Sequence, residues 1–489
     1  MEVEFQSEKA PSDTSGPVPV VVDLDGTLVH GDTLWESFFS LPRHSPLGFL
    51  TATYSLVRGR AAFKAEVAKQ FKPHLNKVVF NEELIEFLRK EAYRRPIILA
   101  TASHITVANS IADELQFFNE VLASDESNLK GRTKLRAVEN CLAANNWLNG
   151  FDYIGDSGAD RPLWAKARKA FAVAPSVQQA KRVSGGINFE RIFVAPAAGP
   201  RAYIKGMRPH QWVKNLLIFA PLLLSRQFAE IDVTIEAVIA FLAFNLCASA
   251  TYLWNDILDV QLDRVHPRKR SRPFASGAIR IPQGLLFSAA LMAAGFGLII
   301  AFLPMIVVGL FLFYIVFTLT YSLYLKEKLL VDAMALGLLY SLRILIGAGA
   351  TGVVVSDWLI AFSTFFFFGL ALVKRYSEIA ISQSTTHEKI AGRGYYAHDV
   401  QILSMLGVAA SFVSILILAL YITSDYVLAN YTRPQALWFV CLVMMYWVSR
   451  VWVLASRKEM PDDPIVFALR DPISLTCGVL CGCAVVVAT

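Results

Sequence analysis

Cysteine is scarce in this sequence and has no metal-binding spacing. There are six cysteines among 489 residues. One of them, Cys141, lies in a segment predicted to be a soluble helix, and the others lie in apolar runs: Cys247, Cys441, Cys477, Cys481 and Cys483. This distribution argues against a disulfide framework or a zinc module as the basis of the fold.

Charged residues are also few for a soluble enzyme. They make up 18% of the chain, whereas hydrophobic residues make up 55%, and the mean hydropathy is +0.45. The apolar runs lie mainly in the second half, and the basic residues cluster beside them, so the net charge of +6 reflects membrane topology and phosphate binding. We therefore expect a membrane protein with a soluble head, in contact with a lipid bilayer and not with nucleic acid.

The beginning of the chain has no pattern of a secretory leader. Residues 1–16 are polar and are expected to be disordered. The apolar run that follows is too short for a leader, and acids come directly after it. We expect the head to stay in the cytoplasm.

A buried strand is predicted at residues 18–22, and it runs into the segment DLDGTLVHGDT. Asp23 and Asp25 follow the strand one residue apart. Gly26 allows a tight turn, so that both carboxylates point into one pocket at the carboxyl end of the strand.

Three further segments also consist of a predicted strand or helix with polar residues near one end. IILATAS at 97–103 is a strand that carries Thr101, with Ser103 as an alternative. Lys134 lies near the start of a predicted helix, with Lys130 as an alternative. DYIGDSGADRPLW at 152–164 is a strand followed by an acidic loop.

In this order, the four segments resemble the motifs of the haloacid dehalogenase (HAD) phosphatases. The resemblance implies that Asp23 is the nucleophile and that Asp25 protonates the leaving group and then activates water. It implies that Thr101 binds the transferring phosphoryl group and that Lys134 neutralises its charge. It also implies one Mg²⁺ ion held by acids of the first and last motifs: Asp23, Asp25, Asp156 and Asp160.

The alternation of strands (18–22, 96–100, 151–154, 170–173) with helices predicts a doubly wound, Rossmann-like parallel sheet over residues 17–195. Residues from about 34 to 90 are expected to form a small helical cap. Within the cap, the apolar piece PLGFLTATYSLV is too short to span a bilayer, so it either fills the core of the cap or lies against a membrane. Residues 196–206 are expected to be a linker.

Residues 207–489 are predicted to form an all-helical, multi-pass membrane domain with nine transmembrane helices. The apolar spans centre near 220, 243, 295, 314, 340, 365, 412, 445 and 480. Lys and Arg are concentrated in alternate connections, which the positive-inside rule assigns to the cytoplasm. The expected topology in the inner (cytoplasmic) membrane has a cytoplasmic head and an extracytoplasmic C-terminus.

Acids are grouped in the segment YLWNDILDVQLDRVHPRKRSRPFASG at 252–277, which begins at the end of an apolar run. Asp256, Asp259 and Asp263 have the spacing i, i+3 and i+7, so a continuous helix places them on one face. Asn255 extends this face by one more oxygen ligand. Crowded acids at the end of a membrane helix need a cation, and Mg²⁺ that bridges to a diphosphate fits best.

The pattern NDxxDxxxD after an apolar helix resembles the first aspartate-rich motif of the UbiA superfamily of intramembrane prenyltransferases. The resemblance extends from about Arg201 to the C-terminus. MRPHQWVKN at 207–215, HPRKRSRPFASG at 266–277 and the segment 321–352 are similar to one branch, the decaprenyl-phosphate phosphoribosyltransferases and their polyprenyl relatives.

The resemblance implies a second Mg²⁺ site at Asn255, Asp256, Asp259 and Asp263, and basic residues that hold substrate phosphates. The second acid pair of the superfamily is incomplete, because Leu336 stands where Asp332 would have its partner. The remaining substrate-binding candidates are Lys214, Arg264, Arg270, Arg272, Tyr321, Lys326, Asp332 and Arg343. Weaker candidates are Asn215, Lys374, Arg375, Glu378, Arg393 and Tyr395.

A fused phosphatase favours phosphoribosyl transfer among the reactions of this superfamily. Transfer of 5-phosphoribose from phosphoribosyl diphosphate (PRPP) to a polyprenyl phosphate leaves a 5-phosphate that the head can remove, whereas ordinary prenyl transfer leaves no phosphomonoester. The implied product, polyprenyl-phosphoryl-ribose, leads to an arabinofuranose donor. Two alternatives stay open: an aromatic prenyltransferase with an unrelated head, or a head that only regulates or docks. The oligomeric state is not indicated.

Overall fold

The computed structural model describes residues 17–70, 78–125, 128–196, 199–266, 268–381, 394–461 and 463–489. The predicted disordered start at 1–16 and Arg393 lie outside the described residues. The chain divides into two compact units. The head unit is Met1–Gly206 with Asp256–Leu286, and the helical unit is Met207–Asn255 with Phe287–Thr489. The segment Asp256–Leu286, which the sequence assigned to the membrane domain, therefore belongs to the head unit.

A six-stranded parallel sheet forms the centre of the head unit, in the order β3-β2-β1-β4-β5-β6. The strands are β1 Val20–Val22, β2 Ile97–His104, β3 Glu120–Ser124, β4 Asp152–Gly155, β5 Ala170–Ala174 and β6 Arg191–Val194. The doubly wound sheet predicted from the sequence is confirmed. From β1 the chain builds one half of the sheet and then returns to β4, so the crevice at the carboxyl ends of β1 and β4 is the expected ligand site.

Strands β3 and β6 were not predicted, and both lie at the edges of the sheet. Most of their residues are only partly buried or exposed. The sequence EVLAS of β3 carries a weak strand signal, whereas RIFV of β6 contains three strand-forming residues in a run of only four.

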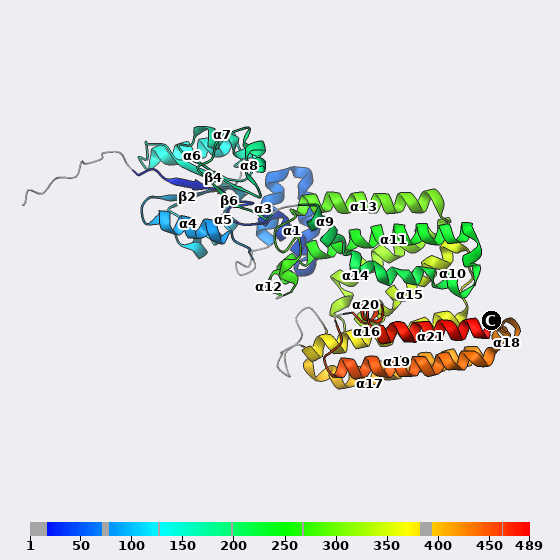
Figure 1. Ribbon diagram of the computed structural model, residues 1–489. Coiled ribbons are helices and arrows are strands. Elements are labelled where there is room, and N and C mark those ends of the chain that lie inside the picture. Colours follow the sequence, from blue (N-terminus) through cyan, green and yellow to red (C-terminus); the bar gives the residue numbers. More distant parts are fainter. Residues whose placement is uncertain are drawn as a thin grey trace, which may run out of the picture. The chain divides into compact units, whose positions relative to one another are not determined.

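Helices cover both faces of the sheet (Figure 1). One face packs against α4 Glu82–Ala92 and α5 Ile105–Leu115, and the other against α6 Arg132–Ala144, α7 Arg161–Lys166 and α8 Val177–Ser184. Alternate residues of the central strands enter the two cores: Val20 and Val22 face the first, and Val21 faces the second. This arrangement buries β1 on both sides and holds the residues that follow it.

Helices α1 Thr33–His44, α2 Pro46–Ser55 and α3 Arg60–Gln70, with the 3₁₀ turn η1 Leu56–Arg58, form the predicted cap. Its core is aromatic, because Phe38 packs against Phe49 and Phe63 with ring centroids 4.8 and 5.1 Å apart. Leu47 and Val57 are 77% and 83% exposed. The apolar piece that contains them therefore does not fill the core of the cap along its whole length.

The helical unit is built from long apolar helices. Seven helices in the described part of the chain are long and apolar enough to cross a membrane. They are α11 Ile231–Leu258, α13 Ile281–Phe302, α14 Met305–Leu323, α15 Val331–Thr351, α16 Asp357–Ile381, α17 Val400–Ile422 and α19 Trp438–Ser456. The first turns of α13 and the last turn of α11 belong to the head unit. A multi-pass membrane protein is thus supported.

Two of the nine predicted spans do not form long α-helices. The run near 220 forms the 3₁₀ helix η4 Pro209–Phe219 followed by the short α10 Ala220–Leu224. The last run forms α21 Pro472–Ala488, whose 17 residues correspond to ~25 Å of helix, less than a ~30 Å hydrocarbon core. Nine transmembrane helices are therefore not confirmed, and the sidedness of the termini remains a prediction. The shorter elements are α9 Pro200–Met207, η5 Gln227–Ala229, α12 Val260–Val265, η6 Lys269–Ser271, η7 Leu325–Glu327, η8 Ala397–Asp399, α18 Asp425–Asn430, η9 Pro434–Leu437 and α20 Pro464–Ala468.

Candidate functional sites

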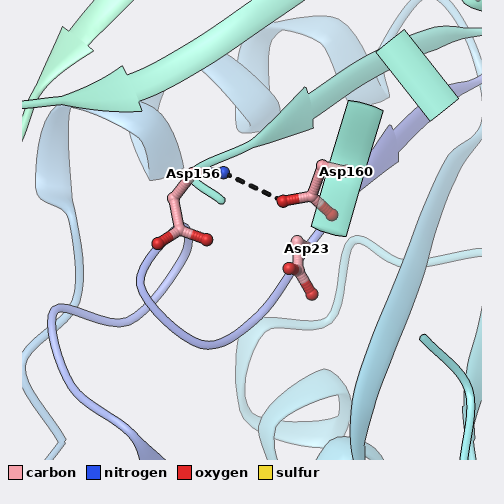
Figure 2. Close-up of side chains that lie close together, drawn as sticks. All are labelled: Asp23, Asp156 and Asp160. Carbon is pink, nitrogen blue, oxygen red and sulfur yellow. Dashed lines mark hydrogen bonds between the residues drawn. The ribbon is translucent and has the colours of Figure 1, made fainter. Parts of the chain in front are cut away.

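Three carboxylates meet at the carboxyl ends of β1 and β4 (Figure 2). Asp23 follows β1, Asp156 follows β4, and Asp160 ends the short 3₁₀ turn η3 Gly158–Asp160. One oxygen of each lies within 4.8 Å of the others. Asp160 is oriented by the Tyr153 hydroxyl, which donates to it at 2.7 Å, and by the Ser157 backbone amide at 3.0 Å. These hydrogen bonds fix the orientation of the Asp160 carboxylate.

Burial and repulsion between carboxylates raise the pKa values of Asp23 and Asp156. Burial raises the pKa of Asp23 to about 7, with further upward contributions from Asp160 and Asp156 and an opposing one from Lys134. Burial raises the pKa of Asp156 to about 6, although Arg280 opposes this shift. A bound divalent cation would stabilise the ionised acids, and their oxygen atoms are the ligands that Mg²⁺ prefers. The donor set therefore fits Mg²⁺.

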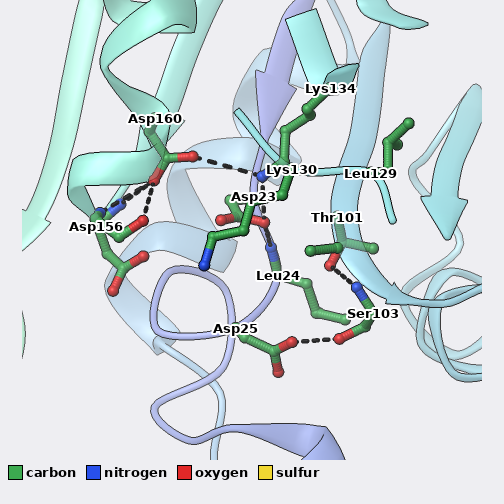
Figure 3. A network of polar contacts seen from close by, with 12 residues as sticks. Asp23, Leu24, Asp25, Thr101, Ser103, Leu129, Lys130, Lys134, Asp156 and Asp160 are labelled. Atoms are coloured by element: carbon green, nitrogen blue, oxygen red, sulfur yellow. Dashed lines mark hydrogen bonds and ion pairs between the residues drawn. The ribbon is translucent and has the colours of Figure 1, made fainter. Parts of the chain in front are cut away.

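Lys134 supplies the buried positive charge of this site (Figure 3). It lies in the first turn of α6, its side chain is 3% exposed, and its ammonium nitrogen is 2.9 Å from Asp23 Oδ1 and 3.5 Å from Asp160 Oδ1. Burial alone would lower the pKa of Lys134, but the two carboxylates raise it above its usual value. Lys134 is thus a permanent cation beside Asp23. The alternative, Lys130, lines the same cavity but is exposed.

Asp25 is held apart from the acid cluster by residues of the cap and of β2. Its carboxylate accepts hydrogen bonds from the Thr33 backbone amide at 2.8 Å and from the Ser103 hydroxyl. Thr101 is buried, and its hydroxyl oxygen accepts from the Ser103 backbone amide at 3.0 Å. The structure thus brings both β2 candidates to the site, with Ser103 on Asp25. Asp25 is not part of the three-acid group within metal-binding distance, so its predicted role as a ligand remains a prediction.

The acids line a cavity of about 450 Å³. The cap contributes an apolar wall to it: Leu34, Trp35, Leu56 and Phe63. Further polar lining residues, which the sequence motifs did not point to, are Asp32, Lys64, Asn128 and Arg280. Burial and the charge of Asp25 raise the pKa of Asp32 to about 7. A cavity with a polar floor and a partly apolar wall suits a phosphomonoester with an organic substituent.

The segment Asp256–Leu286 packs within the head unit, and it carries the acids of the NDxxDxxxD pattern. The helix α11 ends at Leu258, and α12 starts after Asp259, so the predicted continuous helix through all three acids is wrong. Asp256 and Asp263 both accept from Arg272, at 3.1 and 2.7 Å. Asp259 instead pairs with Arg43 of the cap helix α1.

The three aspartates of the predicted second metal site pair with arginine side chains. Among the described residues, Asp256, Asp259 and Asp263 do not form a group within metal-binding distance of one another. Their carboxylate oxygens still suit Mg²⁺ chemically, but Arg272 supplies the positive charge that balances Asp256 and Asp263 in this structure. Asn255, which belongs to the helical unit, accepts from the Ser322 hydroxyl at 2.5 Å.

Two other basic residues of this segment also contact the head. The Arg264 guanidinium donates to both carboxylate oxygens of Glu36 in α1, at 2.7 Å each, and both side chains are less than 10% exposed. Arg280 pairs with Asp156. The exposed Arg270 lies in η6. The predicted role of Arg264 in phosphate binding thus competes with a buried structural pair.

The helical unit contains one cluster of buried charges around Asp463. The ammonium groups of Lys214 and Lys374 lie 2.5 and 3.7 Å from Asp463 Oδ2, and the Tyr340 hydroxyl lies 3.4 Å from it. Arg343 is buried, donates from Nε to Asn215 Oδ1 at 2.8 Å and lies over the Tyr340 ring. Lys214 and Arg343, predicted separately, thus belong to neighbouring parts of one polar network. Asp463 was missed, because the sequence PDDP looks like an ordinary turn.

A second cluster in the helical unit joins Asp332 to Arg375. The two side chains are at most 1% exposed and form an ion pair. Arg375 also pairs with Glu378 and donates to the Tyr321 hydroxyl at 2.8 Å, and the Tyr395 hydroxyl donates to Asp332. Arg375 therefore supplies the counter-charge of Asp332 in this structure. Lys326 lies half-buried in η7.

Comparison with known sequences assigns the two halves of the chain. The model of the UbiA prenyltransferase family matches residues 217–470, more than half of the sequence. The chain belongs to the UbiA prenyltransferase family. The model of haloacid dehalogenase-like hydrolases matches residues 20–165. The chain is therefore a fusion of a HAD domain with a UbiA domain, as the motifs predicted, and these families indicate an enzyme.

Three relatives of this UbiA-family chain match between 39% and 96% of its length. It is 34% identical to the uncharacterized protein y4nM of Sinorhizobium fredii over 96% of this chain and 91% of that protein. It is 32% identical to the nodulation protein NoeC of Azorhizobium caulinodans over 56% of this chain and 89% of that protein. It is also 32% identical to the decaprenyl-phosphate phosphoribosyltransferase of Mycobacterium tuberculosis, over 39% of this chain and 64% of that enzyme.

Proposed function

We propose that this protein carries out two successive reactions on a membrane lipid. The UbiA domain transfers 5-phosphoribose from PRPP to a polyprenyl phosphate of the decaprenyl type, and the HAD domain then removes the 5-phosphate. The final product is polyprenyl-phosphoryl-ribose, a precursor for an arabinofuranose donor. The similarity to decaprenyl-phosphate phosphoribosyltransferases supports the first reaction. The phosphatase-type site fused to that domain supports the second.

In the transfer step, a phosphate oxygen of the lipid forms a bond to C1 of the ribose as the bond from C1 to the diphosphate oxygen breaks. Diphosphate leaves with the bonding electron pair, and the lipid phosphate becomes a phosphodiester. Asp256, Asp259 and Asp263, with Asn255, are assigned to the diphosphate end of PRPP. Arg270 and Arg272 are assigned to its 5-phosphate.

The acceptor phosphate is assigned to the basic residues of the helical unit. Lys214 and Arg343 lie in one buried polar network with Asp463, where a lipid phosphate would find charge-assisted hydrogen-bond donors. Lys326 and Tyr321 are assigned a supporting role at the same phosphate. Asp332 pairs with Arg375, which donates to the Tyr321 hydroxyl, and is assigned to the orientation of Tyr321.

In the hydrolysis step, Asp23 attacks the phosphorus of the 5-phosphate, and the bond from phosphorus to the ribose oxygen breaks. Asp25 donates a proton to that oxygen, and the released product is polyprenyl-phosphoryl-ribose. Asp25 then accepts a proton from the water that hydrolyses the aspartyl phosphate, which returns Asp23 and releases inorganic phosphate. Lys134 stabilises the charge of the phosphoryl group, and Thr101 orients one of its oxygens.

Magnesium is assigned to both sites as the group that balances phosphate charge. In the HAD domain, Asp23, Asp156 and Asp160 would hold it, because their carboxylates already lie within 4.8 Å of one another. In the UbiA domain, Asp256 and Asp263 would hold it together with diphosphate, and Arg272 would have to release them.

One chemical observation carries this proposal. A HAD-type cavity with a cation and three clustered acids, Asp23 among them, is fused to a UbiA domain, and transfer of 5-phosphoribose by that domain would leave a phosphomonoester for the cavity to hydrolyse. A transfer that joins a prenyl group to an aromatic ring gives the HAD domain nothing to hydrolyse.

The test uses the purified full-length protein with PRPP, Mg²⁺ and polyprenyl phosphate, followed by mass spectrometry of the lipids. Wild type should give the ribosylated lipid without the 5-phosphate, and Asp23→Asn should accumulate the 5-phosphorylated lipid. Asp256→Asn should lose transfer and keep phosphatase activity. Absence of any ribosylated lipid, or faster reaction of a prenyl diphosphate with an aromatic acceptor, would reject the proposal.

A further inference from the structure

One cation of the HAD cavity comes from outside the HAD motifs. Arg280 lies directly before α13, within the sequence range of the UbiA family model, and its guanidinium pairs with Asp156. Arg280 and Pro282 both line the cavity that contains Asp23. The Arg280 side chain is 54% exposed, whereas that of Asp156 is 3% exposed. Arg280 therefore reaches the acid cluster from the open side of the cavity.

The transferring phosphoryl group already has a cation of its own. Lys134 is 3% exposed and lies 2.9 Å from the Asp23 oxygen. Lys64, a second cation of the lining, donates to the Ala102 carbonyl in β2 and to the Asn128 side chain in the loop after β3. Arg280 is thus placed to bind something other than the phosphoryl group at Asp23.

We propose that Arg280 determines the specificity of the phosphatase by binding a second anionic group of its substrate, a phosphodiester. This inference rests on the proposed function, in which the substrate carries the lipid phosphodiester on C1 and the phosphomonoester on C5. A cation held by Asp156 would weaken the attraction between Asp156 and Arg280. The planar guanidinium would then be available to bind two phosphodiester oxygens, which matches its hydrogen-bonding geometry.

The part of the chain that follows the HAD domain contributes residues to the HAD cavity. A phosphatase domain that ends near residue 206 would keep the four HAD motifs and lose Arg280. The segment between α12 and α13, which packs within the head unit, thus supplies a substrate-binding residue to the HAD cavity.

A binding experiment with two matched ligands tests Arg280 without turnover. The protein is the full-length Asp23→Asn variant with Mg²⁺, with and without Arg280→Gln. The ligands are methyl ribofuranoside 5-phosphate and the same sugar phosphate with a butyl phosphodiester on C1. Calorimetric titration should show about tenfold tighter binding of the diester ligand, the equivalent of ~1.4 kcal/mol for one exposed charge-assisted contact, and Arg280→Gln should abolish this preference.

Controls separate substrate binding from a structural role. Unchanged binding of the methyl ribofuranoside in Arg280→Gln would indicate an intact cavity, and Arg280→Lys should keep part of the preference. Arg201→Gln removes an exposed arginine of α9 in the same unit and should leave the preference unchanged. In otherwise wild-type protein at saturating Mg²⁺, Arg280→Gln should raise KM for hydrolysis of the diester ligand by a larger factor than KM for the methyl ribofuranoside.

Two results would overturn the inference: no preference for the diester ligand before mutation, or a preference that survives Arg280→Gln. Failure of the proposed function is distinguishable from both. If no ribosylated lipid forms from PRPP while the Arg280-dependent preference persists, the transfer reaction is wrong and the role of Arg280 stands. If neither ligand binds, both are wrong.

Discussion

Replacement of Lys134 by methionine should separate the roles of the two lysines near the HAD nucleophile. Methionine keeps an unbranched side chain of similar length and removes the charge that lies 2.9 Å from Asp23 and 3.5 Å from Asp160. Loss of one preorganised donor to a transition state costs ~10²–10³ in kcat. Because the side chain is 3% exposed, the loss also leaves the buried carboxylates without their positive counter-charge, which costs ~3–5 kcal/mol of folding stability when no metal is bound.

The pH profile of activity distinguishes the loss of the Lys134 charge from a general loss of stability. Asp23 must be ionised to attack, so activity rises with pH through its pKa. Burial raises that pKa to about 7 in the metal-free protein, and Lys134 opposes the rise. Lys134→Met therefore moves the pKa of Asp23 further up and shifts the rise of activity to higher pH at fixed subsaturating Mg²⁺.

The assay is hydrolysis of a generic phosphomonoester by the full-length protein across pH 5.5–9, with thermal unfolding measured on the same samples. Lys130→Met is the comparison, because Lys130 lines the same cavity but is exposed. We expect a smaller loss of kcat and no shift of the pH profile for it. A larger loss in Lys130→Met, or an unshifted profile in Lys134→Met, would refute the assignment of Lys134.

Three other predictions concern the rest of the molecule. Glu36→Gln breaks the buried pair with Arg264 and should lower the free energy of unfolding of the head by ~3 kcal/mol, seen as faster limited proteolysis; unchanged proteolysis would contradict it. Asp463→Asn leaves the two flanking lysine ammonium groups without their carboxylate and should reduce transfer at least ~10-fold, with phosphatase activity as the internal control. Mg²⁺ affinity of the head, measured by calorimetry, should rise from pH 5.5 to 8 as Asp23 and Asp156 lose their protons, and a flat profile would count against these ligands.

The HAD part of the fold could be predicted because its signals are local. A short apolar strand that ends in two acids is recognisable within ten residues, and parallel strands bring their carboxyl ends together at one edge. Asp23, Lys134 and Asp160 therefore lie close together, as expected. Their roles in catalysis remain predictions. The edge strands β3 and β6 were not predicted, since EVLAS has a weak apolar pattern and RIFV is only four residues long.

The NDxxDxxxD segment was harder to predict. Its spacing indicates one acidic face only if the helix continues, but α11 ends at Leu258. Asp259 then pairs with Arg43, more than two hundred residues earlier in the chain, while Asp256 and Asp263 share Arg272. The spacing of residues within a segment does not indicate which residue, distant in sequence, will pair with them.

The order of the motifs and the apolar runs was enough to identify a HAD domain, a UbiA domain and most of the candidate site residues. Those features depend on residues that are close in sequence or on a periodic pattern. The folded chain decided which charged side chains pair. Arg280 pairs with Asp156, Arg264 with Glu36, and Lys214 with Asp463. Buried charges pair with whatever opposite charge the packing brings near, because an unpaired charge in a low-dielectric interior is costly, and packing is a property of the whole chain.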